Sequence, residues 1–234
     1  MVPSPGPWRG SCRRVSSPGA FVRSLRDDPS VPSESDPSES GGASRRRAAL
    51  AGHQGDERAA RALLAHADGA VRATALGALA RLGTATRADV DRAVLDSSPA
   101  VRRRACAVAV AVGDAHVSAL LDDVDPSVVE AAAWALGELG HAATAVVAAL
   151  AATATGHHDP LCREAAVAAL GALGDTRGLP AILRATTDKP AVRRRAVVAL
   201  APFEGPDVEA ALRRACADRD RQVRQAAEDL LAPP

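Results

Sequence analysis

The amino-acid sequence predicts an all-α solenoid of about six stacked helix pairs, and two features of the chain lead to this fold class. Hydrophobic residues make up 47% of the sequence but aromatic residues only 2%, so Ala, Leu and Val must supply most of the core. Ala and Leu are strong helix formers, whereas strands favour aromatic and β-branched residues. Helix start and stop signals also recur roughly every 30 residues, as expected for a stack of helical repeats.

A change of composition near residue 44 divides the chain into a tail and a repeat domain. Residues 1–43 are rich in Pro and Ser and cannot bury enough apolar surface to offset the entropy lost on ordering. We therefore expect residues 1–43 to form a disordered tail and residues 44–234 to form the repeat domain. The Arg-rich, acid-poor start is also typical of a transit peptide, but its prolines would break the amphipathic helix that such a peptide needs.

Each repeat is organised around an apolar anchor residue, which Arg follows in five of six copies. Asp, Ser or Lys stands three positions before each anchor, Pro stands two positions before it in most copies, and Gly follows it by about twelve positions. The anchors are Val71, Val101, Val128, Cys162, Val192 and Val223. The glycines are Gly83, Gly113, Gly140 and Gly174, with Gly205 one position late in the fifth copy.

These recurring positions are helix boundaries. Asp and Ser are favoured N-cap residues, Pro is favoured at the first helical position, and Gly accepts the left-handed conformation that ends many helices. A second apolar stretch precedes each cap, so each repeat consists of a helix A, a short turn and a helix B. A lone helix pair cannot bury its apolar faces, and neighbouring repeats must therefore stack. Arg45 to His53 is expected to form a leading cap helix.

The pattern Val-Arg-x-x-Ala-x-x-Ala-Leu-Gly-x-Leu-Gly, preceded by Asp-Pro, resembles the HEAT repeat. It is most similar to the short repeats of phycobilisome-lyase-like HEAT proteins, and the best copies begin at Asp125-Pro126 and Asp159-Pro160. The resemblance covers residues 44–234 and implies a right-handed superhelix in which helix B lines the concave surface. Such repeats serve as scaffolds, enzyme subunits and nucleic-acid binders, so the resemblance specifies the fold more closely than the function.

The arginines that follow the anchors are expected to form a structural ladder. On a helical projection they lie at the margin of the buried stripe, where each guanidinium could reach helix C-terminal carbonyls or the turn Asp of the next repeat. The expected ladder consists of Arg72, Arg102, Arg163, Arg193 and Arg224, together with Asp68, Asp125, Asp159 and Asp220.

The opposite side of helix B carries the candidate partner-binding residues. Trp134 lies there on a helix otherwise built from Ala, and Trp and Arg are enriched at binding hot spots. We expect Trp134 to be an apolar anchor flanked by arginines that suit an acidic protein partner. The alternative is that Trp134 packs against a neighbouring repeat and that the charges are only solvated. The candidates are Trp134, Arg81, Arg103, Arg104, Glu130, Glu138, Arg194 and Arg195.

The sequence shows no catalytic or cofactor-binding motif, so we expect a non-catalytic scaffold without a cofactor. His157, His158, Asp159 and Cys162 form the one cluster of metal-capable side chains. Adjacent histidines point in different directions, whereas zinc needs four converging ligands, and we expect a solvated loop without a metal. No His is followed by Glu, unlike the His-Glu pairs of HEAT-like di-iron hydroxylases.

Two other functions stay open at this point. The groove arginines could contact phosphates, as in HEAT-like DNA glycosylases, although Glu130, Glu138 and Glu164 would repel them. A lyase-type accessory subunit would rest on the resemblance alone. The net charge of +1 gives no general attraction to nucleic acid or to anionic membranes, and the sequence has no apolar run long enough to span a bilayer. We expect a cytoplasmic monomer that binds another protein.

Overall fold

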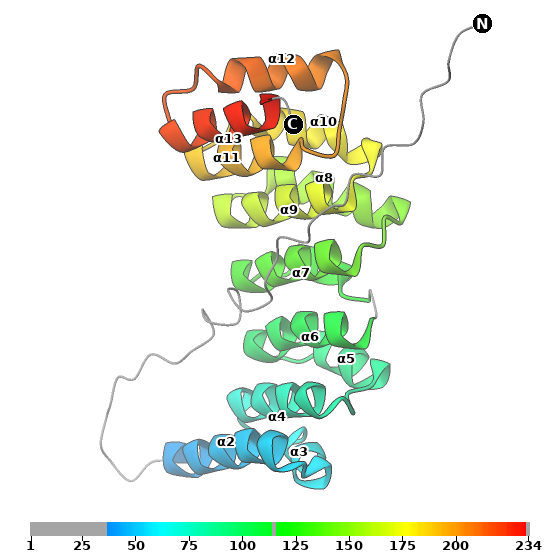
Figure 1. Cartoon of the computed structure of the whole chain (residues 1–234). Helices are drawn as coiled ribbons and strands as arrows, with labels where there is room; N and C mark the ends of the chain where they lie inside the picture. Colours follow the sequence, from blue (N-terminus) through cyan, green and yellow to red (C-terminus); the bar gives the residue numbers. More distant parts are fainter. Residues whose placement is uncertain (1–36, 114–115, 233–234) are drawn as a thin grey trace, which may run out of the picture. The chain divides into compact units, whose positions relative to one another are not determined.

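The computed structural model describes residues 37–113 and 116–232, and the described residues form helices and turns without a strand. The helices are arranged in two layers (Figure 1). The B layer contains α2 (Pro37–Gln54), α4 (Gly69–Leu82), α6 (Pro99–Val112), α7 (Pro126–Leu139), α9 (Pro160–Leu173), α11 (Pro190–Ala199) and α13 (Arg221–Leu231). The A layer contains α3 (Glu57–Leu63), α5 (Arg87–Val94), the 3-10 helix η1 (Ser118–Asp122), α8 (Thr144–Gly156), α10 (Leu179–Ala185), preceded by the 3-10 helix η2 (Thr176–Gly178), and α12 (Pro206–Ala215).

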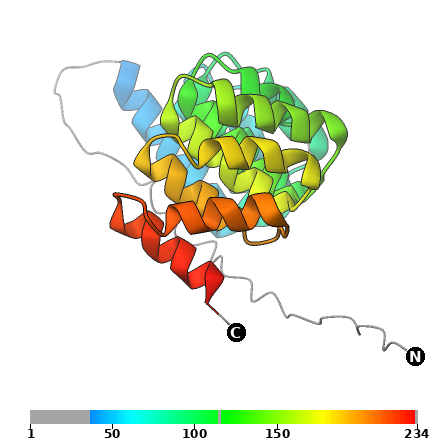
Figure 2. The same cartoon turned by 90° about the horizontal axis from the view of Figure 1, so that it is seen from above.

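The helices pack as a stack of pairs. Each A element packs against the B helix that follows it in the sequence, and each B helix packs against the next B helix along the stack. Seen along the stack, the pairs lie one over another (Figure 2). The predicted all-α solenoid of helix pairs, with α2 as the leading helix, is therefore confirmed.

The predicted helix boundaries correspond to real caps. The side chains of Asp68, Asp125, Asp159 and Asp220 each accept a hydrogen bond from a backbone N–H in the first turn of the B helix that follows. Four B helices end at a glycine with φ between 61° and 78°, the left-handed region that other residues rarely adopt. Both signals read from the sequence thus set the length of helix B.

The core consists of small aliphatic side chains, as predicted. All six anchor residues are buried, from Val71 in the first repeat to Val223 in the last. Leu76, Leu136 and Leu170 are among the largest fully buried side chains. These residues lie on the side of helix B that faces the A layer and the neighbouring repeats.

Two local features differ from the regular pattern. Gly205 does not end α11, which stops at Ala199; it stands before α12, with φ at 120°, as the N-cap of that helix. The predicted role of Gly205 as a helix stop is therefore wrong. The A element of the third repeat is shortened to the 3-10 helix η1, whose Leu120 and Leu121 are nevertheless buried.

The N-terminal boundary of the repeat domain was expected at residue 44. Helix α2 begins at Pro37, so residue 44 lies inside a helix. Residues 1–36 are outside the described part of the chain, and the disordered tail stays a prediction. Among the described residues, no helix combines the length and the apolar character needed to cross a bilayer.

Candidate functional site

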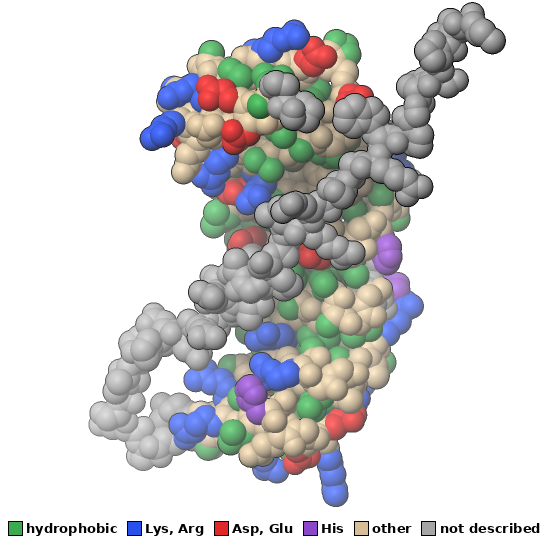
Figure 3. All heavy atoms as spheres, in the orientation of Figure 1, with side chains coloured by type: hydrophobic (Ala, Val, Ile, Leu, Met, Phe, Trp, Pro, Cys, Tyr) green, Lys and Arg blue, Asp and Glu red, His purple; other side chains and the backbone are tan. Residues whose placement is uncertain are grey.

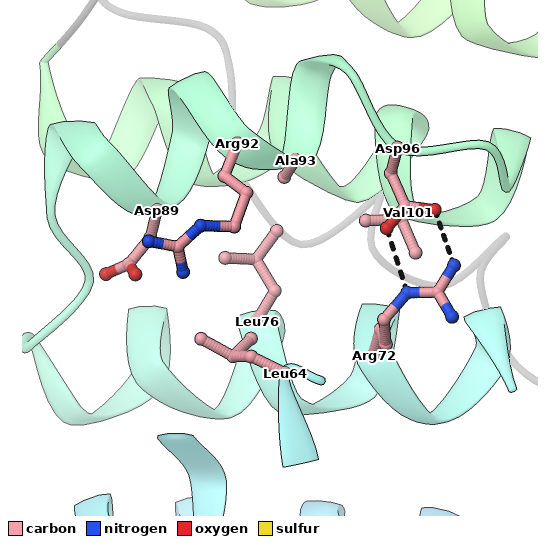
Figure 4. A pocket seen from close by; sticks show the side chains of 8 residues that line it. All are labelled: Leu64, Arg72, Leu76, Asp89, Arg92, Ala93, Asp96 and Val101. Carbon is pink, nitrogen blue, oxygen red and sulfur yellow. Dashed lines mark hydrogen bonds and ion pairs between the residues drawn. The ribbon is translucent and has the colours of Figure 1, made fainter. Parts of the chain in front are cut away.

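The ladder arginines lie at the turns between helices A and B and join successive repeats. In the first repeat, Nε and Nη2 of Arg72 donate to the two carboxylate oxygens of Asp96 at 2.8 and 2.6 Å. Nη1 of the same side chain donates to the carbonyls of His66 and Ala67, both at 2.8 Å. Arg72 therefore binds its own turn through one nitrogen and the turn of the next repeat through the other two. Figure 4 shows the two bonds between Arg72 and Asp96.

The same arrangement recurs along the stack. In each case the carboxylate of the next turn accepts two bonds from one guanidinium, which is the strongest geometry for this pair of groups. The further pairs are Arg102 with Asp123, Arg163 with Asp188 and Arg193 with Asp218. Their guanidinium hydrogen bonds hold the pKa of each of these four aspartates below its ordinary value.

The aspartates of the ladder are not the ones that the sequence analysis selected. Asp68, Asp125, Asp159 and Asp220 accept backbone hydrogen bonds as N-caps and make no ion pair with a ladder arginine among the described residues. Asp96, Asp123 and Asp218 stand two positions before the cap residue, and each also accepts the backbone N–H of that residue. The recurring Asp-x-Asp or Asp-x-Ser before the B helix is the signal that could have identified them.

The ladder is interrupted between the third and fourth repeats. Val129 replaces the ladder arginine and is fully buried. The next turn carries His157 two positions before its cap residue, as the first turn carries His66, and Nδ1 of His157 accepts the backbone N–H of Asp159 at 3.1 Å. Arg224, in the last repeat, donates to the carbonyls of Asp218 and Arg219 and forms no ion pair within the described residues.

The side chains with possible metal chemistry are used for structure. The rings of His157 and His158 stack with centroids 4.5 Å apart. The thiol of Cys162 donates to the carbonyl of Pro126 at 3.2 Å, and burial raises its pKa to about 11. Over the described ranges, no group of three or more His, Cys, Asp or Glu could hold a metal ion.

A small cavity between the first two repeats lies beside the ladder. It is lined by Leu76, Asp89, Asp96 and neighbouring side chains, all labelled in Figure 4. Its volume of about 30 Å³ would accommodate one water molecule but not a metabolite.

The exposed side of the B layer, which we call the B face, carries the candidate partner-binding residues. It is defined by Arg81, Arg103, Arg104, Glu130, Trp134, Glu138, Glu164, Arg194 and Arg195. In Figure 3 basic side chains lie over the lower part of this view, around α2, α4 and α6, and also over its upper end, where acidic side chains lie among them. The structure divides these residues into groups of unlike charge.

Three arginines form the first group, the arginine patch of Arg81, Arg103 and Arg104. None of the three makes a hydrogen bond or an ion pair with any described residue. Burial lowers the pKa of Arg104, and the charges of Arg103 and Arg81 lower that pKa further. The patch is therefore a cluster of positive charge in which no member forms an ion pair with a described residue.

The second group is acidic and lies on the next two B helices. Burial raises the pKa of Glu130, and the charges of Asp159 and Glu164 add to this effect, while Arg103 opposes it. Glu164 pairs with Arg195 at 3.5 Å. Arg194 donates to the side chain of Gln222. Glu138 is exposed at the other end of α7 and forms no ion pair among the described residues.

Trp134 lies on α7, between Glu130 and Glu138 in the sequence. Its side chain is half-buried and packs against the main hydrophobic core. Trp134 was expected either to be exposed for a partner or to pack against a neighbouring repeat. One part of its side chain contacts the core, and another part stays accessible to solvent.

Comparisons with known proteins agree with this architecture. Residues 114–191 match the family model of HEAT repeats. Among solved structures, the chain is similar to the complex of CpcE and CpcF of phycocyanin lyase from Nostoc sp. PCC7120, with 26% identity, 75% of each chain covered and a TM-score of 0.53. The Escherichia coli protein YibA is 14% identical, with 87% of this chain and 77% of that chain covered and a TM-score of 0.56. No curated protein matches the sequence significantly. The predicted HEAT-like repeats are thus confirmed.

Proposed function

We propose that this HEAT-repeat protein is a non-catalytic scaffold that binds a protein partner through the B face, the surface that the HEAT resemblance places on the concave side. One contrast supports the proposal most directly. The ladder arginines are all bonded to turn carbonyls or aspartates, whereas Arg81, Arg103 and Arg104 have no acceptor among the described residues. The fold therefore does not need the charges of the arginine patch for its own stacking.

Trp134 adds an apolar element to the same surface. A half-buried Trp on a helix of small residues offers contact area at low entropic cost, and such residues often dominate the energy of protein interfaces. The adjoining B helices carry unlike charges, which would orient a partner and select against others.

The non-catalytic part of the proposal is supported by the roles of the reactive side chains. A Cys nucleophile acts as its thiolate, and the raised pKa of Cys162 keeps this side chain protonated at neutral pH. The Cys106 thiol is buried, and burial raises its pKa to about 12.

Affinity capture with paired variants tests the proposal. The full chain should retain specific partner proteins that are lost with Arg103→Glu, while Arg58→Glu keeps them, because Arg58 is exposed on the A helix α3 and undergoes the same change of charge. Trp134→Ala should also lose the partners, and thermal melting of each variant separates loss of binding from loss of folding. Equal capture by wild type and by both B-face variants would contradict the proposal.

A second candidate function is that of a subunit in a two-protein lyase. The observation that favours it is the similarity to the CpcE–CpcF complex of phycocyanin lyase. Under this alternative the captured partner would be a second lyase subunit, and lyase activity would require the purified pair and be absent from either protein alone.

Nucleic-acid binding is the remaining alternative. Glu130 and Glu164 lie next to the arginine patch on the B face and would repel phosphates there. A gel shift on random duplex across a salt titration would reveal this function by micromolar binding with a steep salt dependence.

A further inference from the structure

We propose that the B face binds an extended peptide of ordered charge, with acidic side chains over Arg81, Arg103 and Arg104 and a basic side chain over Glu130 and Glu164. This inference rests on the proposed scaffold function and specifies the chemistry of its partner.

Arg104 of the arginine patch is partly buried, whereas Arg81 and Arg103 are exposed. A Cβ atom at Gly77 of α4 would lie 3.3 Å from both Cζ and Nε of Arg104, so this guanidinium lies against the backbone of the preceding B helix. Arg81 also reaches α2, because a Cβ at Gly52 would lie 3.1 Å from its Nη1, although Cα and Cβ of Ala78 would lie closer, at 2.9 Å. Glycine at position 77 leaves room for the Arg104 guanidinium, whereas glycine at position 52 chiefly allows the close contact between α2 and α4.

Such a cluster is electrostatically unfavourable unless an anion joins it. Partial burial removes water from Arg104, and the positive charges of Arg103 and Arg81 lie close by. Glu130 interacts with Arg103 at longer range but forms no ion pair with it. A carboxylate can accept two parallel hydrogen bonds from a guanidinium, and this pairing is strongest where water is excluded. An Asp or Glu side chain of a partner would supply the missing charge.

The acidic pair has the opposite requirement. Glu130 is half-buried and is destabilised in its ionised form by burial and by the charges of Asp159 and Glu164. Among the charges that shift the pKa of Glu130, that of Arg103 in the arginine patch favours the ionised carboxylate. A Lys or Arg side chain placed over Glu130 and Glu164 would therefore stabilise the Glu130 carboxylate, and it would add to the contact that Glu164 already makes with Arg195 at 3.5 Å.

The fold fixes the spacing between the two groups. The patch lies on α4 and α6 and the acidic pair on α7 and α9, and consecutive B helices pack directly against each other. Packed helices are about 8–10 Å apart, and an extended chain advances about 3.3 Å per residue. One helix step separates Arg103 from Glu130 and two steps separate Arg103 from Glu164, so these pairs correspond to an acid-to-base separation of about three to six residues.

A peptide fits this pattern better than a nucleic acid does. A nucleic acid carries a phosphate at every nucleotide, so a strand long enough to cover the patch would also place negative charge over the acidic pair. A peptide can change the sign of its charge within a few residues.

The test uses the full chain as bait for a phage-displayed library of random 12-residue peptides. Enriched peptides should carry Asp or Glu and, about three to six residues away, Lys or Arg. One enriched peptide, labelled and measured by fluorescence anisotropy, should bind Arg103→Glu at least about tenfold more weakly than wild type. Arg58→Glu on α3 should bind like wild type.

A charge exchange completes the design. A peptide in which Lys replaces the acidic residues should recover binding to Arg103→Glu, which loss of folding could not produce. Arg81→Glu serves as a second variant, since Arg81 is exposed and can be changed without disturbing the core.

The outcomes distinguish failure of the charged-peptide inference from failure of the proposed scaffold function. Enriched peptides without ordered charge that still depend on Trp134 would overturn this inference and leave the scaffold function intact. Peptides that bind regardless of Trp134, Arg81 and Arg103 would overturn both. Failure to enrich any peptide would overturn the inference, while affinity capture of a folded partner would still decide the scaffold function.

Discussion

At the residue scale, each complete ladder pair combines two tasks in one contact. Arg102 binds the carbonyls of Asp96 and Ser97 in its own turn and the carboxylate of Asp123 in the next. Asp123 in turn accepts the backbone N–H of Asp125 and so shapes the start of α7. The side chains of Arg102 and Asp123 are 14% and 5% exposed, so solvent screens this pair less than a surface ion pair.

Removing the acidic member of a ladder pair should weaken the fold. Asp123→Ala leaves Arg102 without its carboxylate and should reduce the free energy of unfolding by about 1.5–3 kcal/mol. The pKa of Asp123 is lowered in the folded state, so its contribution is complete above the ordinary value of 3.8 and is lost as the pH falls through the lowered pKa. Urea unfolding at pH 7 and near pH 3 measures both effects.

The neighbouring Asp122 is the matched control. It is exposed at the end of η1, and Asp122→Ala should change stability by less than about 0.5 kcal/mol. Equal losses for the two variants would show that the ladder contributes nothing specific.

Glu130 should show the opposite pH dependence. Its pKa is raised in the folded state, so its ionised form weakens the fold at neutral pH, and this penalty disappears as the pH falls toward the ordinary value of 4.5. Glu130→Gln should therefore stabilise the protein at pH 7, and by less at pH 4.5, as measured by chemical denaturation.

The exposed Glu138 on the same helix provides the comparison, since Glu138→Gln should leave the melting temperature nearly unchanged. A loss of stability in Glu130→Gln at pH 7 would argue against an unfavourable acidic pair.

The arginines of the ladder could be predicted from the sequence, but their partners could not. The cap residues were expected to pair with them, yet a cap Asp uses its carboxylate for the first N–H groups of its own helix. The carboxylate two positions earlier is the one that faces the preceding repeat. Periodicity reveals that a residue recurs, but only the path of the turn decides which repeat it faces.

At the scale of the helix, small residues determine how closely the B helices approach. Gly137 and Gly171 face the next B helix, and a Cβ at Gly171 would lie 2.6 Å from Cβ and 2.7 Å from Cα of Ala199. The backbone of α11 cannot move away from such an atom without shifting the stack.

Gly171→Ala should destabilise the protein although the same change usually stabilises helices. The ordinary gain in helix propensity is about 1 kcal/mol, whereas overpacking of a tight contact costs about 1–3 kcal/mol. A net loss in chemical denaturation is therefore expected. Gly42→Ala in α2 is the control, because nothing lies within 4 Å of its added Cβ, and it should increase stability. A gain in both variants would mean that α9 and α11 are not in tight contact.

Helix boundaries were predictable where a single residue sets them. Cap aspartates and left-handed glycines occur at the expected positions in most repeats. The prediction was wrong at Gly205, because a glycine also suits the start of a helix when its φ is positive, and the sequence alone did not show that α11 had already ended.

At the scale of the whole molecule, stability should be distributed repeat by repeat. Each pair contacts only its neighbours, so the ladder and the B-layer contacts supply the coupling along the stack. The ladder is missing between the third and fourth repeats, where Val129 and His157 replace Arg and Asp. Packing of α7 against α9 joins the two halves at this junction, and the B face crosses it from Glu130 to Glu164.

The fold could be predicted almost completely because six repeats carry the same pattern of cap, anchor and glycine positions. An atypical residue at one position therefore does not change the predicted fold. The B face could be predicted only as a set of residues. Its division into an arginine patch and an acidic pair depends on which side chains the neighbouring repeats bring together, and the +1 net charge of the chain conceals it.

Hydrogen–deuterium exchange of the full chain, with and without a captured partner or a selected peptide, tests the central claim most directly. The account predicts increased protection in α4, α6, α7 and α9 of the B layer, with unchanged exchange in α3, α5 and α12 of the A layer. Protection confined to the A layer, or to the turns that carry the ladder, would contradict the account.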